Sequence, residues 1–292
     1  MGKINVILDT DITNEIDDQF ALVYLLKSLK NIKLEAITLA PFSQNRFSEF
    51  KSLEDNFNLS YECTIKILEM MNLKKYKKVI YKGGDFLKNS KDMNDASLKM
   101  VEIARKNEKT TIIAIGAISN VAKALLFAPD IIPKVEVVWL GGHSFLQDKN
   151  DEYNFRQDVE AVRAVFNSKV KLTVIPCKNV AEVLSVTIYE LEHFIKNKSE
   201  VGKFLYEITA NMKDRKKEIK KENAKVIWDI SAVAYVINPD WLIVREVSAP
   251  KILDDLSYHM TKNKNQINFV NHINRNEIFN DFYTKMGHKY EK

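Results

Sequence analysis

The fold of this chain is decided by Lys3-Ile4-Asn5-Val6-Ile7-Leu8-Asp9-Thr10-Asp11-Ile12-Thr13-Asn14-Glu15-Ile16-Asp17-Asp18. The apolar run at 3–8 stops at an aspartate, a pattern typical of a buried strand. From Asp17 to Leu29, apolar side chains recur with the spacing of a helix that has one wide apolar face. This stretch therefore predicts a buried strand, an acidic turn and a helix.

The alternation of strand and helix continues beyond this first unit. Further strands are predicted at 33–39, 78–81, 110–115, 135–140 and 170–176, and helices at 48–72, 94–107, 119–127 and 157–168. Alternation of this kind produces right-handed crossovers between parallel strands. We therefore predict an α/β fold with an open, mostly parallel sheet covered by helices on both faces.

The chain after residue 185 is predicted to be mainly helical. Helices are expected at 187–197, 199–221, 228–237 and 275–286, with a small strand pair at 243–247 and 267–271. The basic stretch Lys213–Lys225 lacks the interleaved aromatic residues of a nucleic-acid site. We interpret it as a solvated helix face with ion pairs at i,i+4.

Composition limits the class of protein. Hydrophobic residues make up 46% of the 292 residues, enough to bury a core, and the net charge is +5. Only 8 Gly and 6 Pro occur, so flexible linkers are absent and a single domain over residues 1–292 is expected. Two cysteines, Cys63 and Cys177, fit a reducing compartment. The early acidic residues and the lack of a long apolar run predict a cytoplasmic protein with no membrane or nucleic-acid partner.

The acidic turn is the strongest candidate for a functional site. Five carboxylates fall between residues 9 and 18, at the end of the first strand, where open parallel sheets bind ligands. Like charges ~4 Å apart repel by roughly 4 kcal/mol at an effective dielectric near 20, so converging carboxylates need protons, solvent or a cation. Helix capping explains Asp17 and Asp18 but leaves Asp9 and Asp11 unexplained. With no His or Cys nearby, the cation favoured is Ca²⁺ or Mg²⁺ rather than Zn²⁺.

Two enzyme families open with a segment of this kind. The fragment Asp9-x-Asp11-x-Thr13 resembles the opening of haloacid-dehalogenase-type phosphatases, but Gly84-Asp85 is not followed by the second acidic pair of that family. The segment also resembles the opening of nucleoside hydrolases. Later landmarks of that family follow in order: Ile115-Gly116-Ala117-Ile118-Ser119-Asn120, Val137-Val138-Trp139-Leu140-Gly141-Gly142, Glu152-Tyr153-Asn154 with Asp158, and Trp228-Asp229 at the start of a helix.

The resemblance to nucleoside hydrolases implies a metal centre. Asp11 would contact the metal and act as the general base, Asp18 and Asp229 would be metal ligands, and Ile115 would contribute its backbone carbonyl. The implied reaction is Ca²⁺-dependent hydrolysis of the N-glycosidic bond of ribonucleosides, giving ribose and a purine or pyrimidine base. Alternatives are a phosphatase of the type above and a non-catalytic nucleoside- or ribose-binding protein. A homo-oligomer, dimer or tetramer, is also expected.

The resemblance also implies contacts to the sugar. Asp17 would hydrogen-bond a ribose hydroxyl, and Glu152 and Asn154 would bind the sugar hydroxyls from an extended segment in which residues i and i+2 share a face. The turn before Asp17 is two residues longer than the common family version, which places Asn14 inside the site. The sugar-contacting asparagine near residue 40 has no clean match, and Asn45 is the candidate, with Ser43 and Gln44 as alternatives.

The departing nucleobase has no obvious proton donor. Many family members carry a histidine directly before the late aspartate, where this chain has Trp228. Trp228 either stacks on the nucleobase or belongs to the core. His143 follows Gly141-Gly142 at the end of a predicted strand and is the candidate general acid, because an unperturbed imidazole titrates near ~6.5. The alternative is that Trp228 stacks on the base and raises its basicity, so that solvent protonates it.

Overall fold

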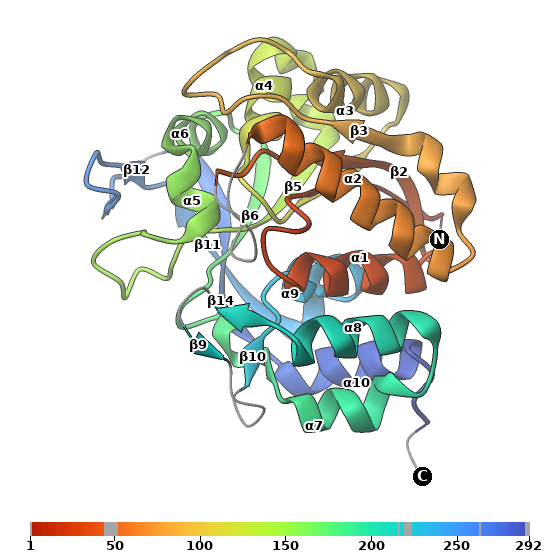
Figure 1. The fold of residues 1–292 in the computed structure, drawn as a ribbon. Helices are drawn as coiled ribbons and strands as arrows, with labels where there is room; N and C mark the ends of the chain where they lie inside the picture. Colours follow the sequence, from red (N-terminus) through yellow and green to blue (C-terminus); the bar gives the residue numbers. More distant parts are fainter. Residues whose placement is uncertain (1, 44–51, 215–216, 219–223, 263, 290–292) are drawn as a thin grey trace.

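A computed structural model describes residues 2–43, 52–214, 217–218, 224–262 and 264–289. Its centre is an eight-stranded sheet with the order β11-β14-β6-β5-β4-β1-β2-β3 (Figure 1). Neighbouring strands are parallel except for β11 and β14, which are antiparallel. The strands are β1 (Ile4–Thr10), β2 (Ile32–Leu39), β3 (Ile80–Lys82), β4 (Thr110–Ala114), β5 (Val135–Leu140), β6 (Lys171–Ile175), β11 (Leu242–Ser248) and β14 (Gln266–Ile273).

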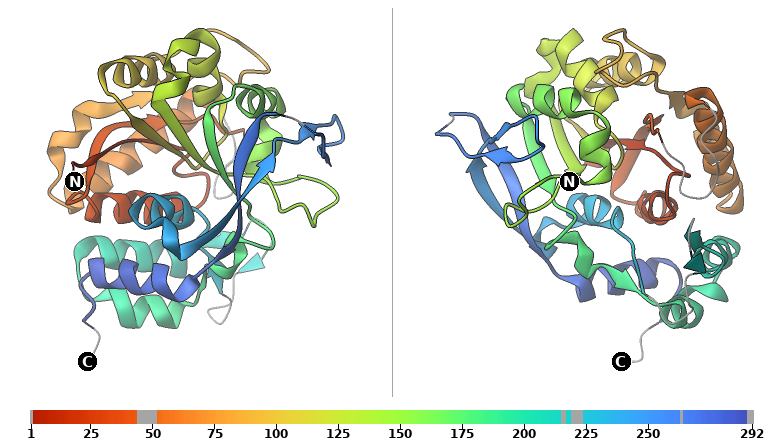
Figure 2. Two further views of the ribbon diagram at one scale, coloured as in Figure 1. Left: turned by 180° about the vertical axis from the view of Figure 1, so that it is seen from behind. Right: turned by 60° about the vertical axis from the view of Figure 1, so that its left-hand side comes forward.

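Helices cover both faces of this sheet (Figures 1 and 2). One core contains α1 (Asp17–Lys27), α2 (Leu53–Met70), α8 (Glu200–Ala210), α9 (Ile230–Ile237) and α10 (Arg275–Lys285). The other contains α3 (Asp95–Lys106), α4 (Ser119–Phe127) and α6 (Val159–Asn167). The central strands are buried along most of their length because helices pack on both of their sides, and β5 is buried at every position. The predicted fold class is confirmed.

Short elements complete the fold. The strand pairs are β7 (Ser185–Val186) with β10 (Lys225–Val226), β8 (Lys213–Asp214) with β9 (Lys217–Glu218), and β12 (Lys251–Ile252) with β13 (Tyr258–His259). The short helices are α5 (Tyr153–Gln157) and α7 (Ile188–Leu191), with further helical turns at Lys74–Val79, Pro129–Lys134, Ala181–Val183, Glu192–Lys196 and Pro239–Trp241. In the described part of the chain, no helix is both long and apolar enough to cross a bilayer.

The helix predicted at 199–221 is wrong in its second half. Helix α8 ends at Ala210, and the short strands β8 and β9 follow. After Met212 the sequence is dominated by like charges, so a longer helix would have no apolar face to pack on the core. The interpretation of Lys213–Lys225 as a solvated helix face is therefore wrong as well.

Three other predictions differ from the structure at their limits. The helix expected at 48–72 begins at Leu53, because the Ser52 side chain caps it by accepting the N–H of Asp55; residues 48–51 lie outside the described residues. The helix expected at 157–168 is divided at Asp158, which ends α5 and caps α6. The strand pair expected at 243–247 and 267–271 is present with slightly longer strands, β11 and β14. In addition, β14 pairs with β6 and so joins the pair to the central sheet.

Candidate functional site

A cavity of about 410 Å³ opens at the carboxyl ends of β1, β4, β5 and β6. Its lining unites segments from the whole length of the chain, because the carboxyl ends of parallel strands meet at one edge of the sheet. The site residues predicted from the sequence that line it are Asp11, Asn14, Asp17, Asp18, Ile115, His143, Glu152, Asn154, Trp228 and Asp229. Asn45 and its alternative Gln44 lie outside the described residues.

A second cavity, of about 510 Å³, lies at the opposite edge of the sheet, at the amino ends of the same strands. Its buried carboxylate, Glu136, is paired with Lys109 and Lys171 at 3.1 Å each. None of the predicted site residues that the structure describes lines it. We therefore place the candidate site at the carboxyl edge.

Three buried aspartates converge in the carboxyl-edge cavity. Asp17, Asp18 and Asp229 each offer a carboxylate oxygen within 4.8 Å of the others. Asp17 and Asp18 form the first turn of α1, and Asp229 directly precedes α9, which packs beside α1. Burial, and then the charge of Asp17, raises the pKa of both Asp18 and Asp229 well above the ordinary range. This arrangement costs free energy unless a positive charge joins it.

Asp11 belongs to the same electrostatic unit. It is buried, and burial followed by the charges of Asp18 and Asp17 raises its pKa well above the ordinary range.

The three converging carboxylates include the predicted ligands Asp18 and Asp229. They also include Asp17, for which the sequence predicted a sugar contact. Lys225, at the same cavity, forms an ion pair with Glu15. The donor set is made of oxygen atoms only, and it fits a hard divalent cation.

Glu152 and Asn154 line the same cavity, and backbone groups hold both. Glu152 Oε2 accepts hydrogen bonds from the N–H of Gly142 at 2.8 Å and of Phe155 at 2.9 Å, and Oε1 accepts from the N–H of Asn154 at 2.9 Å. Asn154 Nδ2 donates to the carbonyl oxygens of Ile115 and Leu140, at 3.1 Å each. Both Nδ2 hydrogens therefore have partners, which leaves Oδ1 as the ligand-accepting atom of Asn154.

The expectation that Glu152 and Asn154 share an extended segment is wrong. Glu152 is the N-cap of α5, and Asn154 lies in its first turn. The Glu152 carboxylate accepts the free N–H groups of that turn, and this local capping favours a helix over a strand. Asp158, four residues after Asn154, is buried outside the cavity lining, where it accepts the N–H of Leu87 and the hydroxyl of Ser119.

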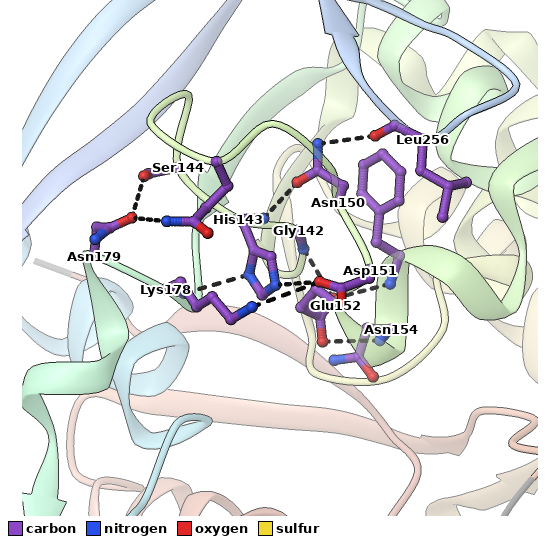
Figure 3. A network of polar contacts seen from close by, with 12 residues as sticks. Gly142, His143, Ser144, Asn150, Asp151, Glu152, Asn154, Lys178, Asn179 and Leu256 are labelled. Atoms are coloured by element: carbon purple, nitrogen blue, oxygen red, sulfur yellow. Dashed lines mark hydrogen bonds and ion pairs between the residues drawn. The ribbon is translucent and has the colours of Figure 1, made fainter.

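His143 is held by a polar network on the rim of the cavity (Figure 3). Its Nε2 lies 3.1 Å from Asp151 Oδ1, and its Nδ1 accepts a hydrogen bond of 3.4 Å from the backbone N–H of Lys178. Lys178 Nζ also approaches Asp151 Oδ1, at 3.6 Å. Burial, and then the charge of Lys178, lowers the pKa of His143 below its ordinary value. The ring is therefore neutral at neutral pH, with its hydrogen on Nε2.

Trp228 lines the cavity and also packs against the core next to α9. Its stacking on a nucleobase stays a prediction. Sequence reasoning did not single out Asp151 and Lys178, although both line the cavity. Two signals were available: Asp151 directly precedes Glu152, and Lys178 follows the carboxyl end of β6. Ser43, the described alternative to Asn45, donates its N–H to Gln157 Oε1 at 2.9 Å and does not line the cavity.

Asp9 is buried and does not line the cavity. Its Oδ1 accepts hydrogen bonds from Thr38 Oγ1 at 2.7 Å and Asn120 Nδ2 at 2.9 Å, whereas Oδ2 has no hydrogen-bond partner. Burial raises the pKa of Asp9 to about 7, although both hydrogen bonds act to lower it. A folded-state pKa above the unfolded value means that ionisation of Asp9 destabilises the fold as the pH rises.

In the metal-free protein, Asp9→Asn is therefore expected to raise the free energy of unfolding above that of wild type by more at pH 8 than at pH 4. Below pH ~4 Asp9 is protonated in both states, and above its folded pKa the full cost of the buried charge is present, about 4 kcal/mol at ~1.4 kcal/mol per pKa unit. Urea unfolding of wild type and variant at pH 4, 6 and 8 measures this change, and other titrating groups cancel in the difference. A difference between the two proteins that does not vary with pH would contradict it.

Comparisons with known proteins agree with this geometry. The family model "Inosine-uridine preferring nucleoside hydrolase" matches residues 62–280. A probable ribonucleoside hydrolase of Dictyostelium discoideum is 30% identical over 142 residues, covering 46% of this chain and 42% of its own. The inosine-uridine preferring nucleoside hydrolase of Crithidia fasciculata is 28% identical over 169 residues, covering 55% and 52%. The chain thus spans about half the length of the curated relatives it matches.

Solved structures show the same fold over nearly the whole chain. A plant nucleoside hydrolase superposes with a TM-score of 0.78 at 17% identity, covering 97% of this chain and 98% of its own. A purine-preferring ribonucleoside hydrolase from Gardnerella vaginalis gives a TM-score of 0.73 at 18% identity, with the same coverage. Because the family model matches most of the sequence, the chain belongs to the inosine-uridine preferring nucleoside hydrolase family.

Proposed function

We propose that this protein hydrolyses the N-glycosidic bond of ribonucleosides with the help of a bound Ca²⁺ ion. The observation that carries the proposal is the buried convergence of Asp17, Asp18 and Asp229 in the same cavity as Glu152 and Asn154. Carboxylates that could hold a cation and further buried polar groups line one cavity, and this combination fits a small ligand with several hydroxyls. Family membership supports the reaction class.

The residues proposed to hold the cation are Asp11, Asp18, Asp229 and the carbonyl of Ile115, with Asp17 close enough to share in the site. When bound, a divalent cation polarises ribose hydroxyls and lowers the pKa of a coordinated water. The preference for Ca²⁺ is part of the proposal and rests on the all-oxygen donor set.

The side chains then have distinct tasks. Asp11 takes a proton from the water that attacks the anomeric carbon. Asp17, the Glu152 carboxylate and Asn154 Oδ1 accept hydrogen bonds from sugar hydroxyls and hold the ring in place. Trp228 stacks on the nucleobase, which leaves with the electron pair of the broken C–N bond.

A panel assay tests this function. Release of ribose is measured for purine and pyrimidine ribonucleosides, with Ca²⁺ and with a chelator. Ribose release that requires Ca²⁺ supports the proposal. Binding of nucleosides without ribose release would instead indicate a binding protein, and release of phosphate from nucleotides would indicate a phosphatase.

We further propose that His143 acts on the departing base as a neutral hydrogen-bond donor. The N–H of Lys178 points at Nδ1, and the pKa is lowered, so an imidazolium that could transfer a proton is disfavoured. The Nε2 hydrogen faces Asp151, whose side chain is 69% exposed and can give way to a nucleobase nitrogen. Solvent then supplies the proton that the base requires.

His143→Ala is expected to lower kcat for natural ribonucleosides by about 10²-fold, the typical effect of removing one donor to developing negative charge. Activity on 4-nitrophenyl riboside, whose leaving group needs no such help, should change only a few-fold. His143→Gln keeps a donor and should recover part of the loss. Normal rates for both substrates in His143→Ala would show that His143 is only a turn residue.

A further inference from the structure

The turn between Asp11 and α1 brings the side chain of Asn14 to the cavity. Thr13 adopts φ 90°, a region that L residues rarely occupy. The backbone N–H of Asn14 donates to the carbonyl of Asp11 at 2.9 Å. The Asn14 side chain lines the cavity, and only 5% of the residue is exposed.

The carboxamide of Asn14 is half satisfied. Its Nδ2 donates to Asp11 Oδ2 at 3.3 Å, whereas its Oδ1 is buried and has no hydrogen-bond partner. Exchanging the two amide atoms would place the carbonyl oxygen against a carboxylate oxygen, and both are acceptors. The orientation is therefore set by Asp11, and the cavity contains a buried acceptor that a ligand hydrogen can satisfy.

We propose that Asn14 is a positioning residue for the attacking water, an inference that rests on the function proposed above. Nδ2 holds the Asp11 carboxylate, and Oδ1 accepts the hydrogen of the water that does not go to Asp11. In a direct displacement the water attacks the sugar from the face opposite the nucleobase. Because Asn14 contacts Asp11, the proposed base for that water, Oδ1 lies on the same face and meets the water rather than the nucleobase.

The attacking water gives up one of its hydrogens as a proton and keeps the other. The water oxygen forms a bond to the anomeric carbon, while the C–N bond breaks and its electron pair leaves with the nucleobase. One water proton passes to Asp11, and the base gains a proton from solvent. The second hydrogen, held by Asn14 Oδ1, stays on the new hydroxyl of ribose. Water has the two hydrogens that this arrangement requires, whereas an alcohol has one.

Competition between water and methanol tests the proposal. Methanol that gives its single O–H to Asp11 must direct its methyl group at Asn14 Oδ1, so wild type should yield ribose and little methyl riboside. Asn14→Leu has a similar shape but no acceptor. It should raise the ratio of methyl riboside to ribose at least ~10-fold and lower kcat for hydrolysis about 10–100-fold, with KM within about three-fold.

Two further variants keep this test decisive. Asn14→Ala should raise the product ratio too, and the ratio does not depend on how much of a preparation is folded. Thr13→Gly alters the same turn, but its side chain does not line the cavity, and it should leave the ratio unchanged. Calorimetry should show Ca²⁺ affinity close to wild type in Thr13→Gly. In the two Asn14 variants the loss should stay within ~10–100-fold, the range for a group that orients a metal ligand such as Asp11.

Specific results would overturn the inference. An unchanged product ratio and kcat in Asn14→Leu and Asn14→Ala would remove Asn14 from the mechanism. An increase in KM at a constant ratio would make Asn14 a sugar contact, and a loss of Ca²⁺ affinity well beyond ~100-fold would make it a metal ligand. Absence of ribose release by the wild type would overturn the proposed function together with the inference, so the two failures are distinguishable.

Discussion

2′-Deoxyribonucleosides are expected to show kcat/KM values up to ~10⁴–10⁵-fold lower than the matching ribonucleosides. A site built to bind hydroxyl groups rejects analogues that lack them, because its buried polar groups are then left unpaired. In this cavity Asp17 and Glu152 are buried, and burial raises the pKa of Glu152. Steady-state rates for ribo and 2′-deoxy pairs of one purine and one pyrimidine nucleoside measure the ratio.

Variants locate the source of this discrimination. Asn154→Ala removes the Oδ1 acceptor and should reduce discrimination between hydroxylated and deoxy sugars. Asp151→Asn changes a carboxylate on the rim of the same cavity and should leave the discrimination unchanged. Similar kcat/KM values for ribo and 2′-deoxy substrates in wild type would contradict the proposed sugar contacts and the proposed cation–diol interaction together.

Asp18→Ala is expected to weaken Ca²⁺ binding by more than 100-fold. Groups that only orient a metal ligand cost ~10–100-fold in affinity when removed, and Asp18 is proposed as a direct ligand. Its removal also lowers the total negative charge of the site, where Asp17 and Asp229 remain to attract a cation. Isothermal titration calorimetry of Ca²⁺ into wild type and variant measures the loss, and an unchanged affinity would refute the assignment.

Two comparisons complete this measurement. Asp151→Ala removes a carboxylate from the same cavity but not from the converging group, so its Ca²⁺ affinity should stay close to wild type. Asp17→Ala distinguishes two roles of Asp17. The sequence resemblance implies a sugar contact, whereas its convergence with Asp18 and Asp229 favours a metal ligand. A loss of Ca²⁺ affinity as large as that of Asp18→Ala would make Asp17 a ligand, and retained affinity with a raised KM would make it a sugar contact.

Local sequence patterns predicted the strands and helices whose formation depends on residues close together in the sequence. Strands such as 110–114 and 135–140 are buried on both faces, so they appear in the sequence as continuous apolar runs. The pattern was less informative near Lys213, where charge dominates and no apolar periodicity remains. It also missed the short helix α5, because the Glu152 carboxylate that caps it resembles any other acidic loop residue.

The sequence by itself determined the strand–helix alternation and the acidic turn at the end of β1, since both follow from burial and charge over short distances along the chain. Only the tertiary structure decided which carboxylates converge, because Asp229 reaches Asp17 and Asp18 through the packing of α9 beside α1. It also decided the state of His143 and the orientation of Asn14. The first depends on burial and on the neighbours Lys178 and Asp151, and the second depends on the hydrogen bond to Asp11. Both environments exist only once the chain is folded.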